Sequence, residues 1–365
     1  MKALITGANG LIGANLVREL LSAGDDVKCM VRATSDTTTL ADVLDDIEVA
    51  FGDVRDPDAI ERALETCDRV YHTAALAEPL GNYDEHIATN VIGTRNVCAA
   101  CASAGIERLV ITSSALAVGG STSEIPIDED APYNLGGFDS PLINSRHLAH
   151  IEALQAAARG LDVVQLCPTG VLGPYDRRPS PAGALVLQVL RGQMRVMDAR
   201  EVSLVDARDV AIAHRLAMEK GSRGERYLLA NTTISIVELA ETVAQVAGVR
   251  APGFSAPDGL FSAWLKLRYI LPGYFFTSMQ RRAVHTVVGQ QYSAERSRSG
   301  LGMVYRPLSE SWQAVVNWFF DSGMARRPSM TGSAPAERPE MPSDRKSDVI
   351  ISAMPQTTTR RRPVE

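Results

Sequence analysis

The chain has 365 residues, of which 22% are charged and 45% hydrophobic, and its formal net charge is −6. This length suits one large α/β domain with a small appended lobe, or two domains, and the composition is that of an ordinary globular protein. The acidic balance argues against nucleic acid as a partner, because phosphate binding depends on basic patches.

No stretch approaches the ~20 consecutive apolar residues that cross a bilayer, so we expect no transmembrane segment. The first residues, MKALITG, lead directly into an apolar strand and leave no room for a signal peptide. Five cysteines are scattered along the chain, and Cys98 and Cys101 have no second pair of ligands nearby. We interpret them as small buried residues and expect no metal site. These features predict a cytoplasmic protein in a reducing compartment.

Short apolar runs alternate with helical patterns through the first half of the chain. Because strands that alternate with helices join through right-handed crossovers, the sequence predicts an α/β fold with a doubly wound parallel sheet, the Rossmann architecture. The predicted strands are 2–6, 26–31, 48–52, 69–75, 108–114 and 162–168, and the predicted helices between them include 11–23, 57–65 and 84–104.

From about residue 175 the alternation loosens, and the patterns predict helices at 184–192, 209–221 and 234–248. Residues 254–320 hold all three tryptophans, and two interpretations stay open: the lining of a lipophilic substrate pocket, or the core of a small helical lobe. Within it, 260–276 has a third interpretation, a segment lying on a membrane surface. The predicted domains are a cofactor-binding core over 1–175 with core elements to about 232, a smaller, mostly helical substrate lobe over 176–323, and a disordered tail over 324–365.

The stretch ITGANGLIGANLVREL, residues 5–20, follows a strand and opens a helix. Gly7 permits a tight turn, Gly10 lets the backbone approach a pyrophosphate, and Gly13 lets the helix pack on the strand. The free amides and the positive dipole end of the helix stabilise phosphates. A long α/β alternation follows, so the pattern indicates a dinucleotide site, which also includes Asn9, Leu11 and Ile12.

The end of the second predicted strand determines which nicotinamide cofactor is preferred. An acidic side chain there would bind the ribose 2′-OH of NAD, but the run CMVRATSD has Arg32, followed by Ser35. A guanidinium pairs with phosphate, so the pattern favours NADP(H) over NAD(H) by about tenfold to hundredfold for one charged hydrogen bond. The alternative is a plain surface arginine. Asp53, after the third strand, is placed to accept from the adenine amino group.

Several motifs resemble those of the extended short-chain dehydrogenase/reductase family, most closely its dihydroflavonol-reductase-like and hopanoid-associated epimerase-like branch. They include TGANGLIG (6–13), VRATSD (31–36), TNVIGTRNV (89–97), VITSSALAVGG (110–120) and VDARDVAIAH (205–214), and the resemblance spans residues 1 to about 323. It implies a homodimer through the helices carrying 84–104 and 142–158. It also implies cofactor contacts at Val54, Thr73, Ala74, Ala75, Asn90, Thr112, Arg146, Pro168, Gly170 and Val171.

In that family a serine or threonine after the fifth strand binds the substrate oxygen, and the tyrosine of a Tyr-x-x-x-Lys motif transfers the proton. The lysine lowers the tyrosine pKa and holds the nicotinamide ribose. Ser114 matches the serine, but SPLINSRHLAH (140–150) puts Leu142 at the tyrosine and Arg146 at the lysine. Leucine has no proton to give, and a general acid contributes about 10²–10⁴-fold. Arg146 can bond ribose hydroxyls but is too basic to donate a proton at neutral pH.

Another group would have to supply the proton. Tyr83 and His86 follow the fourth strand and border the substrate pocket in this fold, and Tyr133, Tyr175 and water are further candidates. His147 follows Arg146 directly, so on a helix it faces about 100° away.

Two hypotheses remain. One is an NADP-dependent oxidoreductase or epimerase that acts on a carbonyl or hydroxyl of a lipophilic small molecule with a non-standard proton donor. The other is a non-redox enzyme, for cyclisation or elimination, or a cofactor-binding scaffold.

Overall fold

The computed structural model describes residues 1–365 except 79–80, 121–124, 195–200, 254–290 and 329–365. Residues Met1–Pro328 form one compact unit. Most of the aromatic-rich segment, including 260–276, and the tail from 329 onwards lie outside the described residues. The alternatives left open for the segment and the disorder predicted for the tail therefore stay predictions.

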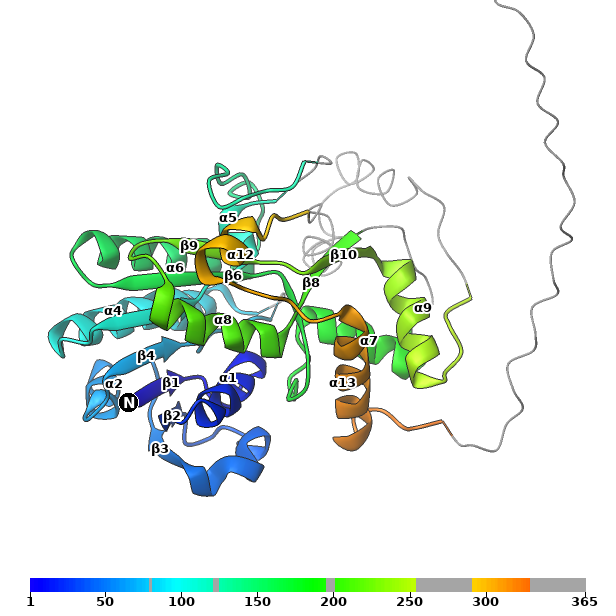
Figure 1. The fold of residues 1–365 in the computed structure, drawn as a ribbon, viewed down its shortest axis with the longest axis horizontal. Helices are drawn as coiled ribbons and strands as arrows, with labels where there is room; N and C mark the ends of the chain where they lie inside the picture. The colour runs from blue at the N-terminus through cyan, green and yellow to red at the C-terminus, as the bar shows by residue number, and fades with distance from the viewer. Residues whose placement is uncertain (79–80, 121–124, 195–200, 254–290, 329–365) are drawn as a thin grey trace, which may run out of the picture. The chain divides into compact units, whose positions relative to one another are not determined.

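Seven parallel strands form the main sheet in the spatial order β3-β2-β1-β4-β5-β6-β9 (Figure 1). The order reverses between β1 and β4, and in such sheets ligands bind outside the carboxyl ends of the strands at the reversal. The predicted doubly wound sheet is confirmed, although β9 was not predicted as a strand. The bounds are β1 (Lys2–Thr6), β2 (Asp26–Val31), β3 (Ile47–Phe51), β4 (Arg69–His72), β5 (Arg108–Thr112), β6 (Val163–Pro168) and β9 (Arg226–Leu229).

Helices cover both faces of this sheet because successive residues of a buried strand point to opposite sides. Leu4 packs into the cluster formed with α2, α4 and α6, whereas Ile5 packs into the cluster formed with α1 and α8, and both side chains are fully buried. Each contributes about 1.5–3 kcal/mol through burial. The helices are α1 (Leu11–Ser22), α2 (Pro57–Leu64), α4 (Gly93–Ser103), α6 (Pro141–Ala158) and α8 (Ala207–Lys220).

The predicted helix over 84–104 is a composite. It consists of α3 (Tyr83–His86), the π-helical turn η2 (Ile87–Ile92) and α4. Single π-helical turns interrupt the regular bonding of a helix and occur often at functional sites. This one contains Asn90. Two shorter helices are η1 (Thr38–Asp46), which contacts α1 and β3, and α5 (Ala115–Val118), which packs against α6 and β6.

The lobe contains a second sheet that the sequence did not reveal. Its three strands are ordered β10-β8-β7, with β10 antiparallel to β8. The sequence predicted a mostly helical lobe and did not predict these short strands. Helices α7, α9 and α13 supply the remaining core of the lobe. The bounds are β7 (Gly170–Leu172), α7 (Pro181–Leu190), β8 (Glu201–Asp206), β10 (Thr232–Ser235), α9 (Ile236–Ala247), α12 (Glu295–Leu301) and α13 (Leu308–Asp321).

The predicted start of the tail at residue 324 is wrong by a few residues. Ala325 is buried in the core of the lobe, and Arg191 Nε donates to the Met324 carbonyl at 2.9 Å. The chain therefore stays packed beyond the end of α13.

No helix within the described residues is long and apolar enough to cross a membrane. Four of the five cysteines are buried, Cys67 is half-buried, and all five are free thiols.

Candidate cofactor and active site

The glycine loop between β1 and α1 has the geometry of a phosphate cradle. Gly7 has φ +70°, and a Cβ there would lie 2.6 Å from the Ala74 Cα. A Cβ on Gly13 would lie 2.3 Å from the Gly7 carbonyl oxygen, so both positions require glycine. Gly10 caps α1 without a side-chain bond, and among the described atoms a Cβ there would meet only the Gly7 oxygen, at 3.3 Å. The start of α1 thus leaves room for a pyrophosphate, and the loop residues fit a dinucleotide.

The residues predicted for the adenosine end lie beyond β2 and β3. Arg32 is exposed, and its side chain has no hydrogen bond or ion pair with the described part of the chain; the Ser35 amide donates to its carbonyl at 2.9 Å. Asp53 accepts from Arg55 through both carboxylate oxygens, at 2.9 and 2.7 Å, and these bonds lower the pKa of Asp53. Arg32 is available to an anion, whereas Asp53 would share its carboxylate between Arg55 and an adenine.

Threonines fix the carboxyl ends of the central strands. Thr73 Oγ1 donates to the Thr6 carbonyl at 2.7 Å. Thr112 Oγ1 lies 2.7 Å from His214 Nε2, and His214 Nδ1 lies 2.7 Å from the Val210 carbonyl. Because a carbonyl only accepts, Nδ1 carries the hydrogen and Thr112 donates to Nε2. Both predicted threonines therefore use their side chains to hold the fold.

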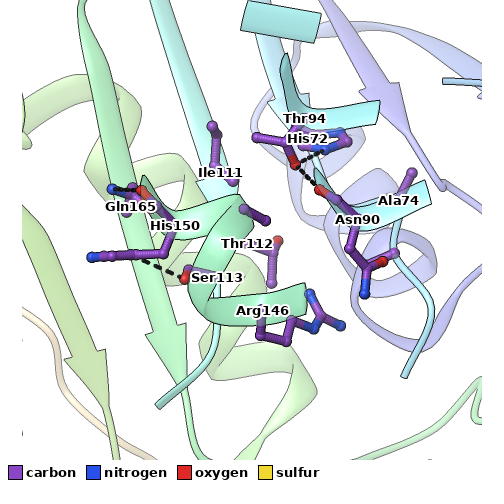
Figure 2. Close-up of a pocket in the computed structure, with 12 residues that line it drawn as sticks. His72, Ala74, Asn90, Thr94, Ile111, Thr112, Ser113, Arg146, His150 and Gln165 are labelled. Carbon is purple, nitrogen blue, oxygen red and sulfur yellow. Dashed lines mark hydrogen bonds between the residues drawn. The ribbon is translucent and has the colours of Figure 1, made fainter. Parts of the chain in front are cut away.

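A small cavity lies between α6 and the ends of β4 and β5 (Figure 2). The guanidinium of Arg146 extends from α6 towards Asn90, and it has no hydrogen bond or ion pair with any described residue. Burial lowers the pKa of Arg146 to about 10, so the group stays charged at neutral pH. An unpaired, half-buried cation is costly, which fits a ligand oxygen at this position. The lining residues are His72, Ala74, Ala75, Asn90, Thr94, Ile111, Thr112, Ser113, Arg146, Ala149, His150 and Gln165.

His150 is a cavity residue to which the sequence gave no role. It lies one helical turn beyond Arg146, and its Nε2 accepts from Arg226 Nη1 at 3.0 Å. Its Nδ1 therefore carries the hydrogen and donates to Ser113 Oγ at 3.3 Å. Burial, and then the charge of Arg226, lower the pKa of His150 to about 3, so the ring is neutral at physiological pH. The i, i+4 spacing from Arg146 was the signal that could have found it.

Of the two proton donors predicted after β4, His86 is held inside the protein. It is fully buried, with Nδ1 3.4 Å from Ser145 Oγ, and burial lowers its pKa. Asn90 Nδ2 donates to Ser145 Oγ at 2.9 Å, so the three groups form one network. Tyr83 is 44% exposed at the start of α3 and is the more accessible of the two.

Ser114 caps α5 and Leu142 lies in the first turn of α6, and these two helices pack against each other. Ser114 caps α5, and its Oγ accepts from the Leu116 amide at 3.2 Å, which leaves the hydroxyl hydrogen available to a substrate oxygen. Leu142 is 4% exposed in the first turn of α6.

The remaining candidate donors lie around these helices. The rings of Tyr133 and His147 stack with centroids 3.4 Å apart, and His147 Nδ1 donates to the Ala117 carbonyl of α5 at 3.2 Å. Tyr175 instead packs on Arg18 of α1.

Of four further predicted cofactor positions, two have structural reasons for their residues. A Cβ on Gly170 would lie 2.9 Å from the Ser203 carbonyl oxygen, so β7 approaches β8 too closely for a side chain. Val54 is buried against Gly93, and its carbonyl accepts from Asn96 Nδ2 at 3.1 Å. Pro168 ends β6 and Val171 is half-buried in β7. Cofactor contacts at these positions remain predictions.

Residues 3–230 match the model of the NAD dependent epimerase/dehydratase family. The chain belongs to this family. It is 33% identical over 338 residues to sterol demethylase protein B of Methylococcus capsulatus, covering 89% of this chain and all of that one. It is 32% identical over 330 residues to a putative dihydroflavonol 4-reductase of Synechocystis, covering 88% and 95%.

Among solved structures, the fold of this chain resembles that of a nucleoside-diphosphate-sugar epimerase from Pseudomonas aeruginosa. The TM-score is 0.74 at 25% identity, with 89% of this chain and 99% of that chain covered. The predicted resemblance to the extended reductases is confirmed. Members of this family are oxidoreductases, epimerases and dehydratases that use a nicotinamide dinucleotide on small molecules.

Proposed function

We propose that the chain is an NADP-dependent oxidoreductase or epimerase that acts on a carbonyl or hydroxyl of a lipophilic small molecule without the usual tyrosine acid. One observation carries this proposal: at the carboxyl ends of the central strands, Ser114 has a hydroxyl hydrogen to give and Arg146 has a charge without a partner among the described residues. A hydroxyl donor and a fixed cation are the two groups that would bind a substrate oxygen and a ribose.

The glycine loop and Arg32 support the choice of cofactor. The first turn of α1 leaves space at Gly10, and the Arg32 guanidinium, which has no hydrogen bond or ion pair among the described residues, would bind a 2′-phosphate. The bound nicotinamide would supply or accept the hydride. Arg146 would hold the nicotinamide ribose, and Ser114 would donate to the substrate oxygen and stabilise negative charge there. Relatives named as a demethylase protein and a reductase support a lipophilic carbonyl or alcohol as substrate.

Carbonyl reduction also needs a proton for the oxygen, and Leu142 cannot give one. His86 is engaged with Ser145 and is disfavoured as the donor. The Tyr133–His147 stack contacts α5, the helix that Ser114 caps, and Tyr83 is exposed to solvent. We propose that the proton reaches the oxygen from this stack, from Tyr83, or from water through Ser114.

A second function is favoured by the loss of both members of the Tyr/Lys pair. Arg146 stays protonated at neutral pH and Leu142 is inert, so the pocket is suited to a proton-neutral reaction such as cyclisation or elimination, or to a cofactor-binding scaffold. In that case product would form, or a partner would bind, with no change in nicotinamide absorbance.

The test begins with a titration of the purified protein by NADPH and NADH, followed through energy transfer from tryptophan to nicotinamide. A panel of lipophilic ketones and alcohols is then assayed with Ser114→Ala and Ser114→Thr. Threonine keeps both the cap and the hydroxyl, so it should retain activity, while alanine should lose about 10²–10³-fold, the usual effect of one removed oxyanion donor. Equal activity of the two variants, or product without nicotinamide turnover, would overturn the redox proposal.

A further inference from the structure

An ion pair joins two distant parts of the chain beside the predicted adenosine site. Arg177 Nε lies 3.2 Å from Asp36 Oδ2, although the residues are 141 positions apart. Asp36 comes directly after Ser35 in the turn that begins with Arg32. Its carbonyl accepts from Asn9 Nδ2 of the glycine loop at 2.9 Å. The pair therefore adjoins both the phosphate loop and the proposed 2′-phosphate position.

The loop that carries Arg177 is anchored to α1. Asn15 Nδ2 of α1 donates to the Pro174 carbonyl at 3.0 Å. The guanidinium of Arg18 lies 3.6 Å above the ring of Tyr175. Tyr175 itself has φ +71°, a backbone conformation that residues with side chains rarely adopt. Backbone held in such a conformation needs firm support from its surroundings, so α1 holds the loop that presents Arg177.

The charge of Asp36 explains why a cation beside it would matter for cofactor binding. A 2′-phosphate carries about −1.5 to −2 charges at neutral pH, and the Asp36 carboxylate beside it would repel it. Arg177 pairs with Asp36, and Arg32, in the turn just before Asp36, has no hydrogen bond or ion pair within the described part of the chain. NAD has only hydroxyls at this position and would not draw Arg177 away from its carboxylate.

We propose that Arg177 is a second ligand of the 2′-phosphate, which shares its guanidinium between Asp36 and the phosphate when NADP(H) binds. This inference rests on the proposed cofactor. It makes the loop after β7 part of the cofactor site and gives it a role in choosing NADP(H) over NAD(H). A planar guanidinium has enough donors to bond a carboxylate and a phosphate at once.

The test compares Arg177→Gln with Arg178→Gln, which removes the same charge one residue away. Arg178 is exposed and has no ion pair or hydrogen bond within the described residues. Binding is measured by calorimetry with four probes: NADPH, NADH, adenosine 2′,5′-bisphosphate and adenosine 5′-monophosphate. We expect Arg177→Gln to weaken NADPH and the bisphosphate by about tenfold or more, and to leave the other two unchanged. Arg178→Gln should match the wild type, and Asp36→Asn should strengthen NADPH binding.

The outcomes separate this inference from the proposed function. If the wild type prefers NADPH and the two glutamine variants bind alike, the role of Arg177 is refuted and the cofactor proposal stands. If Arg177→Gln weakens all four probes equally, the pair only supports the loop, and the inference also fails. A wild type without preference for NADPH would refute both. Arg177→Lys, which keeps the charge, should recover part of the lost NADPH affinity.

Discussion

Placing a tyrosine at Leu142, the position where the family resemblance expects one, is the sharpest test of how this pocket works. In Leu142→Tyr the new ring would stand in the first turn of α6, one helical turn before Arg146. Residues at i and i+4 have Cβ atoms about 5–6 Å apart. A cation about 5 Å from the phenol, at an effective dielectric of about 20, stabilises the phenolate by about 3 kcal/mol, or about two pKa units. That attraction opposes the desolvation of the buried phenol, which raises its pKa, and favours a pKa suited to general acid catalysis.

The matched control is Leu142→Phe, which adds the ring without the hydroxyl. Leu142 is 4% exposed, so both variants share an overpacking cost of about 1–3 kcal/mol, which thermal unfolding of each variant would report. With any substrate that the wild type reduces, we expect Leu142→Tyr to exceed Leu142→Phe in kcat by about 10²-fold or more. Nicotinamide absorbance measures the rate. Equal rates for the two variants would refute the inference that the pocket presents a carbonyl at the usual place.

Two further predictions concern stability. Burial raises the pKa of Asp176 to about 6, above its ordinary value, so its contribution is present below about pH 4 and is lost as pH rises through 6. Asp176→Asn should therefore become more stable relative to wild type by up to about 3 kcal/mol between pH 4 and 8 in urea unfolding, whereas a constant difference would contradict this. Arg306 Nε pairs at 2.6 Å with Asp209, which is 1% exposed, so Arg306→Ala should cost about 3 kcal/mol. Adding Asp209→Asn should recover part of that loss, and no recovery would argue against an unpaired buried charge as its cause.

The sequence predicted the structure correctly where the hydrophobic pattern and the local residue chemistry agree. The alternation of apolar strands and helices predicted the main sheet, and the spacing of Gly7, Gly10 and Gly13 predicted the loop before α1. Gly7 and Gly13 are required by close backbone contacts, and Gly10 leaves open space at the start of α1. The register of Ser145 likewise allowed Leu142 and Arg146 to be located on one helix.

Features that depend on distant parts of the chain were not predictable. The lobe sheet contains strands as short as Gly170–Leu172. Three residues are too few to show the alternating pattern that identifies a strand. The Arg226–His150 contact and the Arg177–Asp36 pair join residues 76 and 141 positions apart. A single sequence carries no signal for such pairs, because each partner alone resembles an ordinary surface or helix residue.

The cavity beside Arg146 has a fixed charge over the physiological range. Burial, and then the charge of Arg146, lower the pKa of His72 to about 4, while burial and then Arg226 lower that of His150 to about 3. The pKa of Arg146 stays near 10. Between about pH 5 and 9 these three groups therefore present one positive charge among neutral rings, and none of them changes its protonation state. A site of this kind favours an electron-rich oxygen and stabilises negative charge on it, but any proton must enter from outside the cavity. In the proposed function, the Ser114 hydroxyl is the group that would bind the substrate oxygen and lie on the path of that proton.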